Sequence, residues 1–219
     1  MIDLAQQREL FIKIADKLAE PLTVYAIGGT AMMLLGLKEN TLDIDLVFLS
    51  HQDREVLRKV VNSLSYDEID AHKIYGARPD TPIMVSLDSA RIDMFTRDIL
   101  GVQFSDDMIH RAEQIHQFGN NLIIKPADIH DIIIMKSATQ RAKDEQDIIK
   151  ILQNRKVKWD VLVQEAENQI KYGNERAILT LGYLLERLSN KKSALVPQEI
   201  LNLLWNMLEK QVKAKKKSA

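Results

Sequence analysis

The amino-acid sequence predicts an α+β fold: a mixed β-sheet domain with flanking helices at residues 1–125, followed by an α-helical carboxy-terminal domain at residues 126–219. Up to Pro126, short apolar runs rich in β-branched residues alternate with helical patterns, as expected of strands and helices packed around one sheet. Beyond Pro126, helical periodicity dominates. The composition, with 46% hydrophobic and 28% charged residues, is typical of a globular protein and excludes disordered and collagen-like chains.

The composition also excludes several kinds of site. The chain has no cysteine, so disulfides, thiolate zinc sites and cysteine nucleophiles are excluded. No run approaches the roughly 18 apolar residues of a membrane span, and residues 1–20 have the pattern of an amphipathic helix, not of a signal peptide. We therefore expect a cytoplasmic protein with no membrane partner. Because the net charge is −1, any binding to nucleic acid must be local.

The chain begins with a helix, a strand and a glycine turn. An amphipathic pattern over residues 3–19 predicts the helix. The sequence TVYAI at residues 23–27 is rich in β-branched and aromatic residues, which predicts a short buried strand. Gly28 and Gly29 interrupt this strand, and a compact helical pattern begins at Thr30.

A second strand and its return helix follow. Residues 42–49, LDIDLVFL, alternate at first and end in an apolar run, which is typical of a partly covered strand. Asp53 opens a helical pattern, and residues 66–80 are polar and irregular, which predicts a loop. Asp88 and Ser89 have the pattern of a hairpin turn between two further strands. The remaining predicted elements before Pro126 are strands at 82–87, 90–96 and 120–126 and a helix near Ser105.

The carboxy-terminal part has a helical pattern almost throughout. Its apolar residues recur at the three- and four-residue spacing of helices that bury one face. The predicted helices lie near residues 127–140, 143–154, 159–171, 174–189 and 197–213.

The glycine turn is a candidate phosphate-binding site. Where a strand turns abruptly into a helix, glycines let a ligand approach the backbone, and the first helical N–H groups are open to an anion. Gly28, Gly29 and Thr30 fit this description. Neither G-x-G-x-x-G nor G-K-[ST] spacing follows, which excludes the Rossmann and Walker phosphate loops. An ordinary turn without a ligand is the alternative.

Two aspartates stand two positions apart in the second strand. Side chains at i and i+2 of a strand share a face, so Asp43 and Asp45 project together while Leu42, Ile44 and Leu46 face the core. Two such close carboxylates repel each other unless a cation lies between them, and their oxygens suit Mg²⁺. The alternative is the polar side of an edge strand facing solvent.

A third acidic residue completes the pattern. Asp93 lies in the strand predicted at 90–96, between the apolar Ile92 and Met94. If this strand pairs with the strand at 42–49, the three carboxylates form one cluster. Such a cluster beside an anion site is what two-metal phosphoryl transfer requires, with one carboxylate activating the attacking hydroxyl.

The order of these motifs resembles a known family. GGTAMMLLGL, then TLDIDLV, then RIDMF is similar to the polymerase-β-like nucleotidyltransferase superfamily, over roughly residues 22–96. The resemblance implies a nucleotidyltransferase-like sheet domain that uses an NTP as donor and two Mg²⁺ ions as cofactors. In that superfamily the equivalents of Asp43, Asp45 and Asp93 are the catalytic and metal-binding acids, and the glycine turn binds the nucleotide.

The following segment has a second resemblance. KPADIHDIIIMKSATQRAKDEQDIIKIL is similar to the stretch after the core of abortive-infection toxin-type (AbiE-like) minimal nucleotidyltransferases. The resemblance implies nucleotide binding by Lys136, Arg141, Asp144 and Asp147, an RNA, tRNA-end or protein acceptor, and an antitoxin-like partner protein. Between Lys136 and Lys158 there are seven basic and three acidic residues, which agrees with binding a triphosphate. The alternative is a solvated helix face with ion pairs such as Lys143 with Asp147.

Three functions are compatible with these patterns. The first is a Mg²⁺-dependent nucleotidyltransferase that moves a nucleoside monophosphate to a hydroxyl acceptor. The second is a catalytically inactive nucleotide- or RNA-binding module that acts through a protein partner. The third is a structural interaction protein, which predicts that Asp43, Asp45 and Asp93 do not converge.

Overall fold

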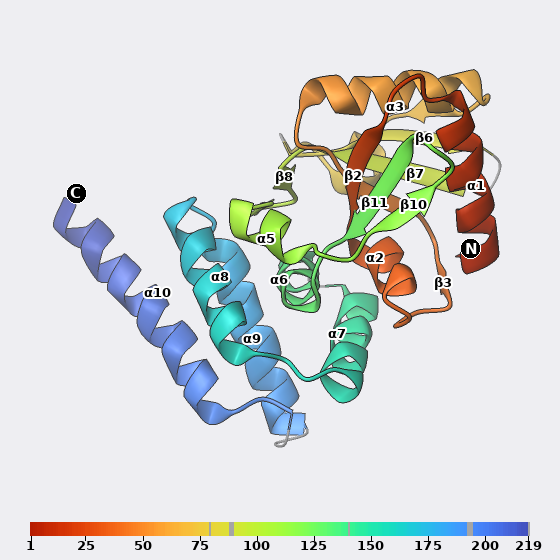
Figure 1. Cartoon of the computed structure of the whole chain (residues 1–219). Helices are drawn as coiled ribbons and strands as arrows, with labels where there is room; N and C mark the ends of the chain where they lie inside the picture. The colour runs from red at the N-terminus through yellow and green to blue at the C-terminus, as the bar shows by residue number, and fades with distance from the viewer. Residues whose placement is uncertain (79, 88–89, 140, 192–194, 219) are drawn as a thin grey trace. The chain divides into compact units, whose positions relative to one another are not determined.

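The computed structural model of the chain describes residues 1–78, 80–87, 90–139, 141–191 and 195–218 (Figure 1). Its contacts divide the chain into two compact units. The first comprises Met1–Ile99 and Asp106–Asp128, and the second comprises Leu100–Ser105 and Ile129–Ala219. The predicted fold class is confirmed, with a mixed sheet and helices in the first unit and a helical second unit. The division into a nucleotidyltransferase-like domain at residues 1–125 and a helical domain at residues 126–219 stays a prediction.

A mixed sheet forms the centre of the first unit. Over the described residues it has seven strands in the order β10-β11-β2-β4-β7-β6-β5. β11 is parallel to β2 and β4 is parallel to β7, whereas the other neighbouring pairs are antiparallel. The strands are β2 (Leu22–Ala26), β4 (Ile44–Val47), β5 (Asp67–Ile69), β6 (Ile83–Leu87), β7 (Ala90–Phe95), β10 (His116–Phe118) and β11 (Leu122–Pro126).

Capping side chains set the starts of the two longest helices around this sheet. Before α1, the Asp3 carboxylate accepts from the Gln6 backbone N–H at 2.8 Å, and the Gln6 side chain accepts from the Asp3 N–H. The Ser50 hydroxyl caps α3 by accepting from the Asp53 N–H at 3.0 Å. The first unit contains α1 (Leu4–Lys17), α2 (Gly28–Leu34), α3 (His51–Ser63), α4 (His72–Tyr75), α5 (Asp106–Arg111) and the short strands β1 (Ile2–Asp3), β3 (Asn40–Thr41) and β8 (Asp98–Ile99).

Two predictions for the first unit are wrong, and the proposed turn is not described. The predicted loop at 66–80 contains the edge strand β5 and the four-residue helix α4, which are too short and too polar to show a period. The side chain of Leu42 is 55% exposed and does not face the core, because β4 begins only at Ile44. Asp88 and Ser89, the predicted hairpin turn, lie outside the described residues.

The second unit packs around an apolar helix. α6 buries Ile132, Ile133 and Ile134 completely, so it has no single polar face and lies among α7, α8 and α9. Its elements are β9 (Val102–Gln103), α6 (Ile129–Thr139), α7 (Ala142–Asn154), α8 (Trp159–Lys171), α9 (Glu175–Lys191) and α10 (Gln198–Ser218). All the helices predicted for this part of the chain are confirmed, with ends shifted by a few residues. Among the described residues, no helix combines the length and apolar character that crossing a bilayer requires.

Phe11 anchors α1 on the sheet, and its removal tests this packing. The side chain is fully buried, and its ring packs edge-on against that of Phe118 of β10, with 5.0 Å between the ring centroids. We expect Phe11→Ala to lower the free energy of unfolding by about 3–5 kcal/mol, because the cavity adds to the lost burial. The neighbouring Ile12 is 39% exposed, so Ile12→Ala should cost about 1 kcal/mol or less. Urea denaturation measures both, and equal losses would contradict the assignment of Phe11 to the core.

Candidate active site

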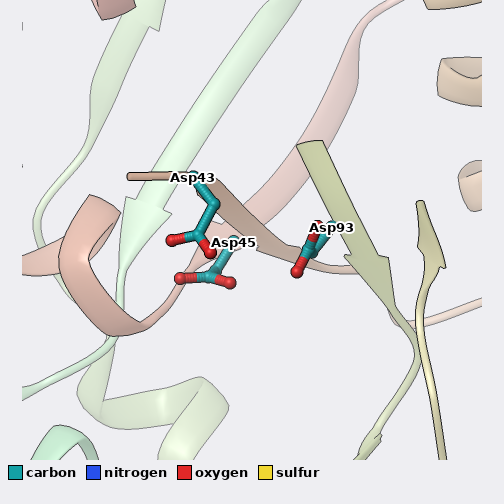
Figure 2. A group of neighbouring side chains, drawn as sticks. All are labelled: Asp43, Asp45 and Asp93. Carbon is teal, nitrogen blue, oxygen red and sulfur yellow. The ribbon is translucent and has the colours of Figure 1, made fainter. Parts of the chain in front are cut away.

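The structure brings Asp43, Asp45 and Asp93 together. Asp45 of β4 and Asp93 of β7 are register partners on two parallel strands, and Asp43 lies one residue before β4. One carboxylate oxygen from each aspartate can be chosen so that all three lie within 4.8 Å of one another. Figure 2 shows Asp43 and Asp45 side by side, with Asp93 on the neighbouring strand. A spacing this small is compatible with a shared cation.

Buried apolar residues fix the face on which the aspartates project. Ile44 and Leu46 alternate with Asp45 along β4 and are almost completely buried, as are Ile92 and Met94 around Asp93. A slip of one residue in either strand would turn these apolar side chains toward the acidic face. The hydrophobic residues therefore set the register that aligns the carboxylates.

The glycine turn lies directly against Asp45. Gly28 has a φ of +57°, and a Cβ added to it would come within 2.5 Å of an Asp45 carboxylate oxygen. A Cβ on Gly29 would come within 2.2 Å of the Thr41 hydroxyl oxygen. Both glycines are therefore needed for α2 to start beside β4. The predicted phosphate turn and the predicted acidic cluster are neighbours in the structure.

Thr30 fixes the backbone that carries Asp43 and Asp45. Its hydroxyl oxygen accepts from the Asp45 N–H at 2.9 Å, and the hydroxyl donates to the Asp43 carbonyl at 3.4 Å. The residue is fully buried. The side chain of Thr30 thus holds the start of β4 instead of facing a nucleotide.

The sequence interpretation missed Arg91, which joins two of the aspartates. Its Nε donates to Asp93 Oδ1 at 2.8 Å, and its Nη2 donates to Asp93 Oδ2 at 3.2 Å and also to Asp43 Oδ2. A signal for it exists in the sequence, because Arg91 and Asp93 stand at i and i+2 of one strand and share a face.

Tyr75 also contacts the cluster, from the short helix α4. Its hydroxyl donates to Asp93 Oδ2 at 2.5 Å, and its ring packs edge-on against Phe95. Burial raises the pKa of Tyr75, and the charges of Asp45 and Asp93 raise it further, so the phenol stays protonated and can donate. Nothing in the irregular sequence at 66–80 could have identified this residue, because its contact depends on how the segment folds back over β7.

The cluster has an excess of negative charge. Burial raises the pKa of Asp93, as does the nearby Asp43 carboxylate, although Tyr75 and Arg91 act in the opposite direction. Three carboxylates against one guanidinium leave a net charge of −2 when all are ionised. Carboxylate oxygens in this number and spacing fit a hard divalent cation such as Mg²⁺ or Mn²⁺. The Arg91 guanidinium already bound there shows that the site attracts positive charge.

The other four predicted site residues form a buried ion network in the second unit. The Lys136 ammonium donates to Asp144 Oδ1 at 2.8 Å and to Asp147 Oδ2 at 2.7 Å, and Arg141 Nε donates to Asp144 Oδ2 at 2.9 Å. The Thr139 hydroxyl also donates a hydrogen bond to Asp144 Oδ2. Lys136 is only 7% exposed, so this is not the solvated helix face that was the alternative.

The charges of this network depend on one another. Burial alone would lower the pKa of Lys136, but Asp144 and Asp147 outweigh it, so the pKa is raised. Burial alone would raise the pKa of Asp144, but Lys136, with Thr139 and Arg141, holds it below its ordinary value. Lys136 and Asp144 therefore hold each other in the charged form near neutral pH.

A small pocket opens beside the ion network. Its volume is about 60 Å³, much less than the roughly 300 Å³ or more of a site that encloses a small-molecule ligand. Arg141 lies on it with a side chain that is 45% exposed, whereas Lys136 is almost covered. The residues that line it are Lys136, Ser137, Arg141, Glu145, Thr180, Tyr183, Leu184 and Arg187.

Comparison with known proteins gives one family match and several remote structural matches. A family model described as "Nucleotidyltransferase of unknown function (DUF6036)" matches residues 1–189. No curated protein matches the sequence. Among solved structures, ANT(2")-Ia in complex with adenylyl-2"-tobramycin is 17% identical, with a TM-score of 0.42, over 83% of this chain and 98% of that one. The CCA-adding enzyme with CTP is 15% identical, with a TM-score of 0.34, over 83% of this chain and 50% of that one.

Substitution of Gly28 tests its close approach to Asp45. Gly28→Ala places a Cβ in the left-handed region and against the Asp45 carboxylate. We expect a loss of about 2–5 kcal/mol in the free energy of unfolding, from backbone strain and overpacking together. Gly36 also has a positive φ, of +69°, but the space around it is open. Gly36→Ala should therefore lower the free energy of unfolding by about 1–2 kcal/mol, from backbone strain alone. Equal losses in chemical denaturation would refute the contact.

Removal of the Lys136 charge tests the buried network. We expect Lys136→Met to lower the free energy of unfolding by about 3–5 kcal/mol at pH 7, because two buried carboxylates lose their partner. The exposed Lys143 is the control, and Lys143→Met should change stability by less than about 0.5 kcal/mol.

The same variant should respond to pH. Because the pKa of Asp144 is lowered in the folded protein, its stabilising contribution is present above its ordinary value of about 3.9 and is lost as the pH falls through the lowered pKa. In Lys136→Met the carboxylates of Asp144 and Asp147 lack the buried ammonium and instead gain from protonation. The stability gap to wild type should therefore narrow between pH 7 and about pH 3 in urea denaturation. A gap that stays constant would mean that the carboxylates are not coupled to Lys136.

Proposed function

The chain belongs to this nucleotidyltransferase family, and on that premise we propose that it transfers a nucleoside monophosphate from an NTP to a hydroxyl acceptor in a Mg²⁺-dependent reaction. The observation that carries the proposal is the convergence of three aspartate oxygens within 4.8 Å of one another beside the glycine turn. This arrangement joins carboxylates that fit a cation to a backbone that a phosphate can approach closely.

Asp43 and Asp45 would hold two Mg²⁺ ions, with Asp93 completing the site. When bound, the ions offset the charge of the triphosphate and stabilise charge on the attacking and leaving oxygens. Gly28 and Gly29 would bind the phosphates through their backbone, and Thr30 would support them by holding the start of β4. The side chains in these roles come from two adjacent strands and the turn beside them, which is a rigid support for catalysis.

Asp93 would act as the general base. The acceptor hydroxyl oxygen forms a bond to the α-phosphorus, the bond from that phosphorus to the bridging oxygen of the β-phosphate breaks, and pyrophosphate leaves. The proton of the hydroxyl passes to the Asp93 carboxylate. Oδ2 of Asp93 accepts from Tyr75 and Arg91, whereas among the described residues Oδ1 accepts from Arg91 alone, so Oδ1 would be the oxygen that takes the proton.

The second unit would contribute to nucleotide binding through Arg141. Its half-exposed side chain lies on the small pocket, and a guanidinium suits a phosphate. Lys136 donates to both Asp144 and Asp147, and Asp144 also accepts from Arg141. Through these contacts Lys136, Asp144 and Asp147 would position the Arg141 guanidinium. Within this proposal the four residues act together on the nucleotide, as the sequence resemblance implies.

We leave the acceptor as a class: a hydroxyl of RNA, of a tRNA end or of a protein. The AbiE-like subtype and an antitoxin-like partner stay predictions from the sequence. The inactive binding module is the remaining alternative, and turnover separates it from the enzyme.

Substitution of both metal-binding aspartates tests the proposal. Wild type should release pyrophosphate and transfer label from one member of an α-³²P-NTP panel to cellular RNA or protein with Mg²⁺ or Mn²⁺. We expect Asp43→Asn with Asp45→Asn to lose at least about 100-fold in rate, and Asp93→Asn to lose about 10²–10⁴-fold as the base. Asp67→Asn, at an exposed aspartate of β5, should retain the wild-type rate.

The outcomes divide the two functions. Wild-type protein without turnover for any NTP, but with NTP binding, would support the inactive module and refute the transferase. Activity that survives in the doubly substituted protein would remove the aspartates from the mechanism. Thermal unfolding of each variant confirms that a loss of rate is not a loss of fold.

A further inference from the structure

Arg91 occupies the position between two of the carboxylates that would bind metal. Its Nε and Nη2 reach both oxygens of Asp93 at 2.8 and 3.2 Å, and the same Nη2 donates to Asp43. Arg91 and Asp93 belong to the same strand and share a face, so no rearrangement of the backbone is needed for this contact. The guanidinium side chain is 22% exposed and has a path to solvent.

A divalent cation would require the same oxygens. Mg²⁺ binds carboxylate oxygens at about 2.0–2.1 Å, closer than a guanidinium does, and it would meet the positive charge of Arg91 at short range. Oδ2 of Asp93 already accepts from both Tyr75 and Arg91, and Oδ1 accepts from Arg91. A cation bound by Asp43 and Asp93 would therefore compete with the guanidinium for the same oxygens and would lie close to its positive charge.

We propose that Arg91 is a built-in competitor of the divalent cation, an inference that rests on the proposed function of the aspartate cluster. In the cation-free protein Arg91 offsets part of the negative charge of Asp43 and Asp93 and stabilises the folded cluster. Metal binding exchanges one cation for another, and the guanidinium swings toward solvent. Arg91 thereby lowers the affinity of the site for free cation, so that the additional charge of a bound nucleotide triphosphate is needed to fill it.

A titration of the full chain with Mn²⁺, followed by the EPR signal of the free ion, tests this inference. We expect Arg91→Gln to bind Mn²⁺ about tenfold more tightly than wild type, a change of about 1.4 kcal/mol. Arg91→Lys keeps the charge and should stay within about threefold of wild type. Tyr75→Phe removes an uncharged donor from the same Asp93 oxygen and should tighten binding less than Arg91→Gln.

Three results would overturn the competition. They are an Arg91→Gln affinity equal to or below that of wild type, a gain for Arg91→Lys as large as that for Arg91→Gln, and a gain for Tyr75→Phe as large as that for Arg91→Gln. Asp43→Asn with Asp45→Asn should abolish binding in all backgrounds. If neither wild type nor Arg91→Gln binds Mn²⁺, with or without an NTP, the metal-dependent function proposed above fails, and this outcome is distinct from a failure of the inference alone.

A second measurement uses unsubstituted protein, in case Arg91→Gln does not fold. The Arg91 Nε–H signal in ¹⁵N NMR, assigned by its loss in Arg91→Lys, reports whether the guanidinium is ion-paired. As Mg²⁺ saturates the site, we expect this signal to move to the position of an exposed arginine and to exchange faster with water. An unchanged Arg91 signal at full Mg²⁺ occupancy would show that the guanidinium is not displaced.

Discussion

The parallel pairing of β4 with β7 is the constraint on which the site depends. Its register places Asp45 opposite Asp93, and the buried Ile44, Leu46 and Ile92 keep both strands from slipping. Backbone pairing provides the rigidity, and hydrophobic burial decides which face receives the carboxylates. The position of the carboxylates is therefore a consequence of core packing. A substitution in the core that shifts the β4–β7 register would also displace the carboxylates.

This pairing creates an electrostatic problem that the surrounding residues reduce. Three carboxylates lie close together, and Asp93 is fully buried, so the charged cluster opposes folding. Tyr75 and Arg91 stabilise it with hydrogen bonds and a positive charge, and the Thr30 hydroxyl holds the Asp43–Asp45 backbone in place. The same carboxylate oxygens accept hydrogen bonds that stabilise the metal-free protein and would have to become ligands when a metal binds.

The aspartates were predictable from the sequence because strand alternation is local. Asp43 and Asp45 are two residues apart, and the apolar neighbours of Asp93 mark it in the same way. Arg91 has the same local signal, but the contact of Tyr75 depends on tertiary structure, because it lies in a segment without a period and no local pattern places it at β7. The role of Lys136 could not be decided either, since a helical Lys near two aspartates has the same sequence pattern on a solvated face and in a buried network.

The contact between Gly28 and Asp45 has a consequence for how such sequences diverge. Because a Cβ at position 28 would come within 2.5 Å of the Asp45 carboxylate, position 28 cannot gain a side chain while that carboxylate stays in place. A side chain at 28 must be accompanied by a shift of the Asp45 carboxylate or by a shorter residue at 45, and either change takes a carboxylate out of the cluster. Among descendants of this chain, the two positions should covary, and loss of the glycine would mark lineages in which the acidic site is no longer under selection.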